Sequence, residues 1–128
     1  MSTEYMANDG PSPKEIVYGK DIEIPKFVFE DRRIPAGAKV YYGMLCLLIN
    51  SDGVLSYTDE QLEELPGMSE GKVTRYNKAL GDNGYITRKV TNIPYRNDEG
   101  KFLWKKHREM HVRTSPNGSD NEKRRDWV

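Results

Sequence analysis

The most strongly apolar part of the chain lies between Lys39 and Asp52, where no residue is charged. Its apolar side chains are Val40, Tyr41, Met44, Leu45, Leu47, Leu48 and Ile49. On a helical projection they point in every direction, which predicts a helix over residues 36–49 that is buried on more than one side. Pro35 suits the start of this helix. Either the N-terminal segment covers the back of the helix, or a second subunit does.

Two shorter patterns predict a pair of helices joined by a tight turn. Thr58 and Gln61 have the spacing of a capping box, which begins a helix that reaches about Leu65 and ends at a Pro-Gly pair. Ser69 is the natural N-cap of a third helix, and Gly84 is its natural stop. A helix, a tight turn and a second helix in this order have the spacing of a helix-turn-helix motif.

The segment before the long helix has an extended pattern. Residues 15–24 contain two short apolar stretches separated by a Gly-Lys pair, which predicts a small hairpin. Residues 26–30 predict a short extended segment, with Phe27 and Phe29 on one side of it. The domain is therefore expected to begin with extended chain.

Strand patterns also follow the first and third helices. Residues 54–57 predict a short strand, and residues 85–91 and 101–112 predict two longer ones. Between the longer strands, residues 92–100 contain Pro94 and several turn-forming residues, which predicts a loop. A basic hairpin directly behind a helix-turn-helix is a wing.

These elements predict an α+β fold of the winged helix-turn-helix class, with three helices, a C-terminal β-hairpin wing and an N-terminal extended segment. The chain of 128 residues is long enough for one ordinary domain. Residues 1–14 are expected to form a disordered leader, residues 15–113 the winged-helix domain, and residues 114–128 a flexible tail or linker.

The total charge by itself does not suggest a nucleic-acid binder, because 20 Lys+Arg balance 20 Asp+Glu. The charges are sorted along the chain, however. Residues 1–65 hold six basic and twelve acidic side chains, whereas residues 66–113 hold eleven basic and five acidic ones. An acidic half followed by a basic half favours one face that binds a polyanion.

The third helix and the wing supply the candidate contacts with DNA. At about 100° per residue, Val73, Tyr76 and Leu80 form an inner stripe, so the basic side chains lie on the outward face. In a major groove, Arg can bind guanine bidentately, while Lys, Ser and Thr can hold phosphates. The predicted DNA-binding residues are Ser69, Lys72, Thr74, Arg75, Lys78, Arg88, Lys89, Arg96, Lys101, Lys105 and Lys106. For any one of them, an ordinary solvated side chain is an equal alternative.

Other kinds of site find little support. Cys46 is the only cysteine, which excludes an internal disulfide and a cysteine-based zinc cluster, and its apolar surroundings predict a buried, inert thiol. His107 and His111 have the spacing of a zinc-protease motif, but Arg108 stands where that motif needs Glu. Phosphate-binding loops and nucleophile elbows are absent. We therefore expect no metal, no cofactor and no enzymatic activity.

Two further expectations concern packing and location. Trp104 and Met110 are expected to pack within the wing and the core, and not to form a stacking platform. The apolar run at residues 40–49 is too short to cross a bilayer, and the N-terminus lacks the apolar core of a signal peptide. A cytoplasmic protein without a membrane partner is expected.

The order of the motifs resembles a known family. The motifs are Ile-Pro-Lys-Phe at 24–27, Ala-Gly-Ala-Lys-Val-Tyr-Tyr-Gly-Met-Leu at 36–45, Asp-Gly at 52–53, the helices at 58–65 and 69–80, and Gly-Tyr-Ile at 84–86. Their order is similar to that of the N-terminal winged-helix domain of plasmid and phage replication initiators and replisome organisers of Gram-positive bacteria. The resemblance spans residues 22–113. It implies that the third helix and the wing bind duplex DNA, through Lys72, Thr74, Arg75, Lys78 and the basic residues of 88–106.

The resemblance also implies partners. Members of this family usually continue into a second domain that recruits helicase or loader proteins, so replication proteins are expected to bind through a C-terminal region. A homodimer is expected from the apolar first helix. Two other functions stay open: a transcriptional regulator with the same fold, and a protein-interaction module whose contact surface is the acidic N-terminal half.

Overall fold

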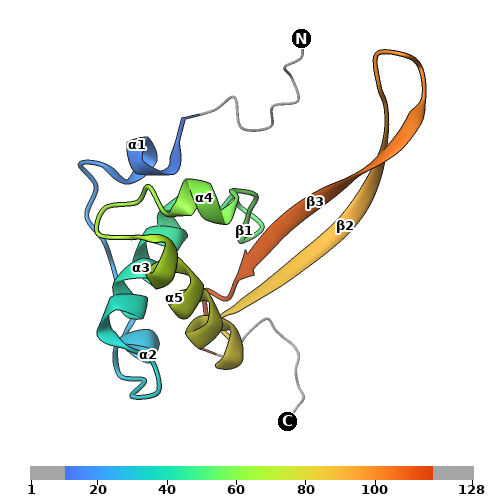
Figure 1. Ribbon diagram of the computed structural model, residues 1–128. Coiled ribbons are helices and arrows are strands. Elements are labelled where there is room, and N and C mark those ends of the chain that lie inside the picture. Colours follow the sequence, from blue (N-terminus) through green and yellow to red (C-terminus); the bar gives the residue numbers. More distant parts are fainter. Residues whose placement is uncertain (1–10, 117–128) are drawn as a thin grey trace.

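The computed structural model describes residues 11–116 and has an α+β architecture. Its helices are α1 (Pro13–Val17), α2 (Lys26–Phe29), α3 (Ala36–Leu48), α4 (Asp59–Leu62) and α5 (Glu70–Asp82). Its strands are β1 (Val54–Leu55), β2 (Ile86–Arg96) and β3 (Phe102–Val112). They form an antiparallel sheet in the order β1-β3-β2, whose two long strands project beyond the helices (Figure 1).

Helix α3 lies at the centre of the core. It starts after Pro35, as predicted, and its most buried side chains, Tyr41, Tyr42 and Leu45, are inaccessible to solvent. Helices α4 and α5, the turn between them and the base of the hairpin supply further core residues, which are Leu62, Leu65, Val73, Leu80, Ile86, Met110 and Val112. No helix within residues 11–116 is long and apolar enough to cross a membrane.

The N-terminal segment is helical where an extended structure was predicted. Residues 13–17 form α1 in place of the first strand of the expected hairpin, and residues 26–29 form α2 in place of the extended segment. Helix α1 begins with a capping box: the Ser12 hydroxyl accepts from the Glu15 N–H, and the Glu15 carboxylate accepts from the Ser12 N–H. The predicted leader therefore ends too late, because Pro13 is buried, and residues 1–10 lie outside the described part.

The two phenylalanines of α2 do not share one side. Phe29 is 63% exposed, whereas Phe27 is partly buried against the core and stacks on Tyr85, with ring centroids 6.0 Å apart. An extended segment would place residues two apart on the same side, and a helix turns them away from each other. The segment therefore contributes one aromatic ring to the core.

The back of α3 is covered by this same N-terminal segment. Helix α1 packs on α3, and the chain that follows passes so close to Gly43 that an added Cβ would lie 2.5 Å from Ile22 Cγ2 and 3.1 Å from the Glu23 carbonyl oxygen. Of the two covers considered for α3, the structure therefore contains the intramolecular one. The homodimer stays a prediction, but a covered α3 no longer supports it.

The pair α4 and α5 follows the predicted capping signals. Thr58 and Gln61 form a complete capping box, and the Ser69 side chain accepts from the Lys72 N–H. Helix α4 is shorter than predicted, since it ends at Leu62 and a turn carries Leu65 into the core. Helix α5 ends at Asp82, and Gly84 follows its C-cap with φ 83°, a left-handed conformation that glycine adopts without a steric penalty.

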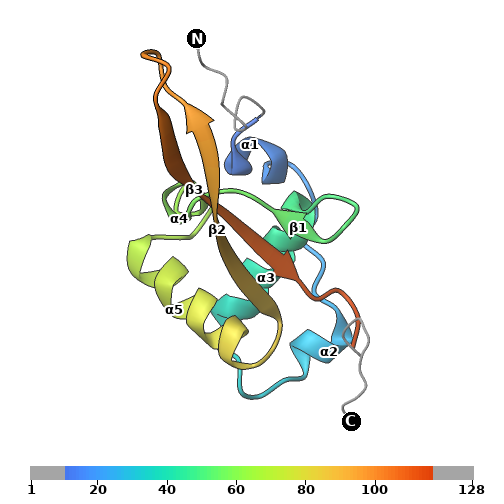
Figure 2. The same cartoon turned by 90° about the vertical axis from the view of Figure 1, so that its right-hand side faces the viewer.

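The β2–β3 hairpin is longer than predicted. Residues 92–96 were expected in the loop but belong to β2, so the turn is confined to residues 97–101. Pro94 did not end the strand because β2 lies at the edge of the sheet, where a missing N–H costs no ladder hydrogen bond. Strand β1, by contrast, is limited to Val54–Leu55 and not residues 54–57. Figure 2 shows the base of the hairpin beside α5 and its outer part beyond the helices.

A buried amide joins three helices and the hairpin. Tyr41 Oη on α3 donates to Asn77 Oδ1 on α5 at 2.7 Å. Asn77 Nδ2 donates to Asp59 Oδ1 on α4 at 3.4 Å, and Arg88 on β2 donates to the same oxygen at 2.8 Å. Burial raises the pKa of Tyr41, so its hydroxyl stays protonated and can donate at neutral pH.

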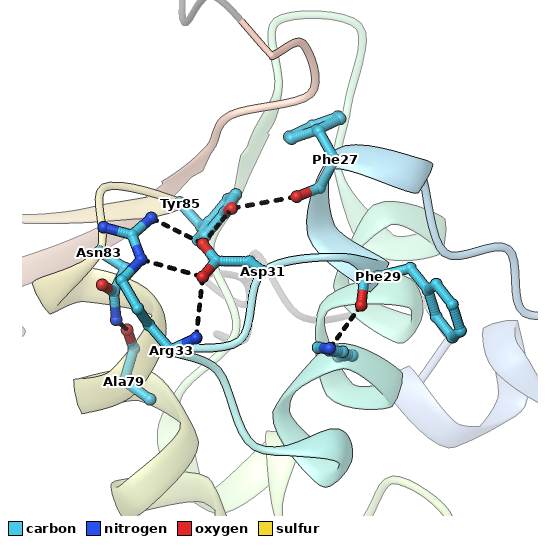
Figure 3. A network of polar contacts seen from close by, with 8 residues as sticks. Phe27, Phe29, Asp31, Arg33, Ala79, Asn83 and Tyr85 are labelled. Atoms are coloured by element: carbon cyan, nitrogen blue, oxygen red, sulfur yellow. Dashed lines mark hydrogen bonds and ion pairs between the residues drawn. The ribbon is translucent and has the colours of Figure 1, made fainter.

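A second polar network fastens α2 to the base of the hairpin (Figure 3). Asp31 accepts from the backbone N–H and the guanidinium of Arg33, and from Tyr85 Oη at 2.7 Å. The Arg33 hydrogen bonds, followed by that from Tyr85, hold the pKa of Asp31 well below its usual range. The Arg113 guanidinium lies over the Tyr85 ring at 4.6 Å and over the Phe27 ring at 5.5 Å.

Replacement of the buried amide should lower stability. The Asn77→Ala variant leaves the Tyr41 hydroxyl without its acceptor inside the core, and we expect a loss of about 2 kcal/mol in the free energy of unfolding. Urea denaturation followed by circular dichroism measures it. The exposed Asn92→Ala is the control and should change stability by less than about 0.5 kcal/mol. Equal stability of the two variants would contradict the role given to Asn77.

The close packing behind α3 can be tested with two glycines. Gly43→Ala places a methyl group against Ile22 and the Glu23 backbone, and overpacking of this kind costs about 1–3 kcal/mol. Gly71→Ala on α5 meets only Arg75 Nη1, at 3.8 Å, and should raise stability by about 0.5–1 kcal/mol, as alanine is the better helix former. Thermal unfolding measures both, and a Gly43→Ala variant as stable as the parent would show that this face is open.

The Asp31 network predicts a pH dependence of stability. A carboxylate whose pKa is lowered by folding stabilises the protein above its unfolded pKa of about 3.9, and the contribution is lost as the pH falls below it. We expect Asp31→Asn to be less stable than the parent at pH 7 and 5, with a difference that shrinks below about pH 4. Urea unfolding across this range measures it, with the exposed Asp21→Asn as control. A difference that persists undiminished at pH 2.5 would refute the assignment.

Candidate nucleic-acid interface

Helix α5 separates an inner stripe from an outward polar face. Val73, Tyr76, Asn77 and Leu80 are buried, as the helical spacing predicted. The residues predicted to bind DNA on this helix are all exposed: Ser69, Lys72, Thr74, Arg75 and Lys78. The side of α5 that faces solvent is determined by its buried inner stripe and by the caps at the starts of α4 and α5. The outward face is therefore a fixed surface with three cations.

The cations of α5 make weak contacts of their own. Lys72 Nζ donates to the Gly67 carbonyl oxygen at 3.2 Å, and the Arg75 guanidinium lies 5.6 Å from the centre of the Tyr76 ring. Lys78 pairs with Asp82 at 3.0 Å, one turn later, but its side chain remains 77% exposed. Exposed pairs of this kind contribute little energy, so these side chains can exchange them for another anion.

The hairpin divides its cations between two faces. Directly paired residues of antiparallel strands share a face, and the faces alternate along each strand. By this rule Arg88, Arg96 and Lys106 lie on one face, and Lys89 and Lys105 on the other. The remaining predicted residue, Lys101, lies in the turn. All six are exposed, but they do not extend one continuous positive surface as expected from the sequence.

The two arginines of this set already have partners within the protein. Arg88 forms the ion pair with Asp59 described above, with 44% of its side chain exposed. The Arg96 guanidinium lies 4.7 Å from the centre of the Phe102 ring, its cross-strand neighbour. Arg88 therefore has a structural role that sequence reasoning did not find, because its partner lies on a different element.

An acidic cluster borders the start of α5. It consists of Asp59, Glu60, Glu63 and Glu70, from α4, the turn after it and the first residue of α5. Desolvation, followed by the neighbouring carboxylates of Glu70, Glu60 and Asp59, raises the pKa of Glu63. A phosphate is repelled here, although the N-terminus of a helix by itself attracts anions. On α5, the surface most favourable to a polyanion is therefore the middle of the helix, around Thr74, Arg75 and Lys78.

The two histidines flank one carboxylate. His107 Nε2 and His111 Nε2 each lie 3.2 Å from an oxygen of Glu109, and hydrogen bonds with both imidazoles lower the pKa of Glu109. Within residues 11–116 no group of three or more potential ligands is arranged to hold a metal ion. The thiol of Cys46 is partly buried, and burial raises its pKa, which disfavours the reactive thiolate.

Sequence reasoning missed three exposed residues of the hairpin. Arg108 was not among the predicted contacts, yet it is exposed and shares a face with Lys106. Trp104 is 69% exposed and Phe102 64% exposed, so the expected packing of Trp104 is wrong, whereas Met110, 4% exposed, does lie in the core. The alternation of a strand through residues 102–112 could have placed all of these side chains on one face.

No family model matches the chain, and no curated protein matches it. Among solved structures, one described as "N-Terminal domain of DNA binding protein" is similar, with a TM-score of 0.52 and 20% sequence identity. The similarity covers 75% of this chain and 76% of that one. At this level of identity, the comparison shows that the two chains share a fold.

Proposed function

We propose that this chain is a winged-helix domain that binds duplex DNA. The element order α3, β1, α4, α5, β2, β3 and the strand order β1-β3-β2 fit that fold, with α4 and α5 as the helix-turn-helix and the β2–β3 hairpin as the wing. The solved structure with the same fold carries a description as part of a DNA-binding protein. Helix α5 is the recognition helix in this assignment.

The observation that carries the proposal is the outward face of α5. An α-helix is about 10–12 Å wide, close to the roughly 12 Å width of the major groove. Thr74, Arg75 and Lys78 project from the middle of the exposed face, away from the acidic cluster at its start. Arg75 is suited to a bidentate contact with guanine, and Lys78 to a phosphate.

The biological role that we propose is replication initiation in a phage or plasmid. Its support is the order of motifs shared with the initiator and replisome organiser family, from the Ile-Pro-Lys-Phe segment to the Gly-Tyr-Ile after α5. A transcriptional regulator would use the same surface. Sequencing of DNA fragments that the protein retains from phage or plasmid DNA distinguishes the roles, since an initiator enriches an origin and a regulator enriches promoters.

Duplex binding should depend on salt and on the middle of α5. We expect Arg75→Ala/Lys78→Ala to weaken binding to a labelled duplex by ten-fold or more, and to reduce the slope of log K against log salt by about one, because Lys78 is the residue assigned to a phosphate and each lost phosphate contact removes about 0.9. Fluorescence anisotropy at several salt concentrations measures both. Lys20→Ala/Lys26→Ala removes the same charge from exposed sites in the N-terminal segment and should leave the affinity within about two-fold.

Two outcomes would contradict this proposal. One is the absence of duplex binding at low salt by a folded protein, which would favour a protein-interaction module that uses the acidic surface. The other is an equal loss of affinity in both double variants, which would show that only the total charge matters and that α5 holds no binding site.

A further inference from the structure

The outer part of the hairpin carries a face that no other element covers. Strand pairing places Val90, Asn92, Pro94 and Arg96 of β2 beside Arg108, Lys106, Trp104 and Phe102 of β3. We call these eight residues the distal face; all of them are exposed. On the same side of the sheet, nearer the helices, Ile86 and Met110 are buried in the core. The distal face is therefore the solvent-exposed outer part of the side of the sheet that packs on the core.

The aromatic side chains of this face are exposed to water, which is unfavourable for large apolar groups. Trp104 and Phe102 are 69% and 64% exposed, and Val90, which pairs with Arg108 further along the same face, is 56% exposed. A large apolar surface that stays in contact with water is a mark of a binding site. Arg96 lies over the Phe102 ring, while Trp104 is paired with Pro94 across the strands. The indole of Trp104 is therefore the most open flat surface on this face.

The charge of the distal face indicates the kind of partner. Its cations are Arg96, Lys106 and Arg108, and none of its eight residues carries a carboxylate. Strand β1 pairs only with Met110 and His111, so β3 has an open edge further out along the hairpin. Pairing of a second copy with this edge would bring like charges together and is disfavoured. A polyanion satisfies both the cations and the aromatic rings if it also carries flat apolar groups, as nucleic acids do.

The spacing of the rings selects unpaired nucleotides. Side chains two residues apart on a strand lie about 7 Å from each other. Bases in one strand of a duplex are stacked about 3.4 Å apart and bury their faces against each other. Only a splayed single strand can place successive bases on Phe102 and Trp104, with its phosphates near Lys106 and Arg108 on the same strand.

We propose that the distal face binds single-stranded DNA by stacking unpaired bases on Trp104 and Phe102. This site lies on a different element from α5 and does not depend on duplex binding. A domain that holds both could bind a duplex site through α5 and the adjacent opened strand through the hairpin. The inferred activity is thus a second mode of nucleic-acid binding within the same domain.

Trp104 itself reports on the contact. The chain has two tryptophans, Trp104 and Trp127, so Trp127→Phe leaves Trp104 as the only tryptophan, which is excited selectively at wavelengths that tyrosine does not absorb. A single-stranded oligothymidylate should quench this emission, while a duplex of the same length at the same salt concentration should quench it far less. Equal quenching by both, or none by the single strand at saturation, would refute stacking on this face.

Anisotropy with the labelled single strand locates the site. Trp104→Ala should weaken binding about ten-fold or more, since one stacked base is worth that much. Tyr95→Ala, an exposed aromatic on the opposite face of the hairpin, should stay within about two-fold. Circular dichroism confirms that both variants fold. Equal losses in the two variants, or a loss in neither, would overturn the proposal.

Two further measurements separate this site from others. The Arg75→Ala/Lys78→Ala variant should lose duplex binding but keep single-strand binding, so failure of one proposal is distinguishable from failure of the other. Sedimentation velocity tests the competing occupant. A dimer that forms at micromolar concentration and is abolished by Trp104→Ala would assign the distal face to a second copy and overturn the proposal.

Discussion

The amide of Asn77 is the polar contact on which the arrangement of the helices depends. It is almost fully buried, at 4% exposure, and it accepts from Tyr41 on α3 while donating to Asp59 on α4. If the helices shifted, the buried amide would lose its hydrogen-bond partners, and an unsatisfied buried amide lowers the stability of the fold. The network is therefore compatible with one arrangement of the three helices. The direction in which α5 faces solvent follows from this arrangement. Arg88 extends the same network to β2, and so links the hairpin to the helices.

A chain of zero net charge can hold a positive surface because its basic residues are concentrated in the second half of the sequence. Some charges are paired with each other within the protein, such as Asp59 with Arg88 and Asp31 with Arg33. Those that remain on the middle of α5 and on the distal face are mostly cations. The acidic cluster beside the start of α5 limits where a polyanion can approach. The N-terminal segment completes the core by covering α3, so the domain encloses its long apolar helix within one chain.

The sequence predicted those parts of the fold that local signals determine. The capping residues Thr58 and Ser69 and the left-handed Gly84 marked α4 and α5, and the apolar run marked α3. The prediction failed where tertiary context decides. The capping box at Ser12 lies in a segment with the composition of a flexible leader. From the sequence alone, Pro94 indicates a loop. Its strand lies at the edge of the sheet, where proline is tolerated, and the sequence does not show this.

In the candidate site, too, local patterns were predicted correctly and long-range contacts were not. Helical periodicity was enough to place the α5 residues on one exposed face. Because residues 92–96 were assigned to a loop, the cross-strand partners of residues 102–106 were not predicted, and the division of cations between two faces was missed. The alternation of the predicted strand at 101–112 could have placed Trp104, but its exposure was not inferred from it. The ion pair of Arg88 joins residues that are 29 positions apart, and no local pattern indicates it. Long-range contacts of this kind decide which charged residues are structural.

The most direct test of the account is to map the backbone amides that respond when duplex DNA binds. Two-dimensional NMR of the labelled protein, titrated with a short duplex that it binds, reports on each amide separately. If α5 is the recognition helix, the changes are concentrated at residues 69–78, with smaller ones along the hairpin and none in α1 and α2. Changes centred on α1, α2 or the exposed side of α3, with α5 unchanged, would contradict it.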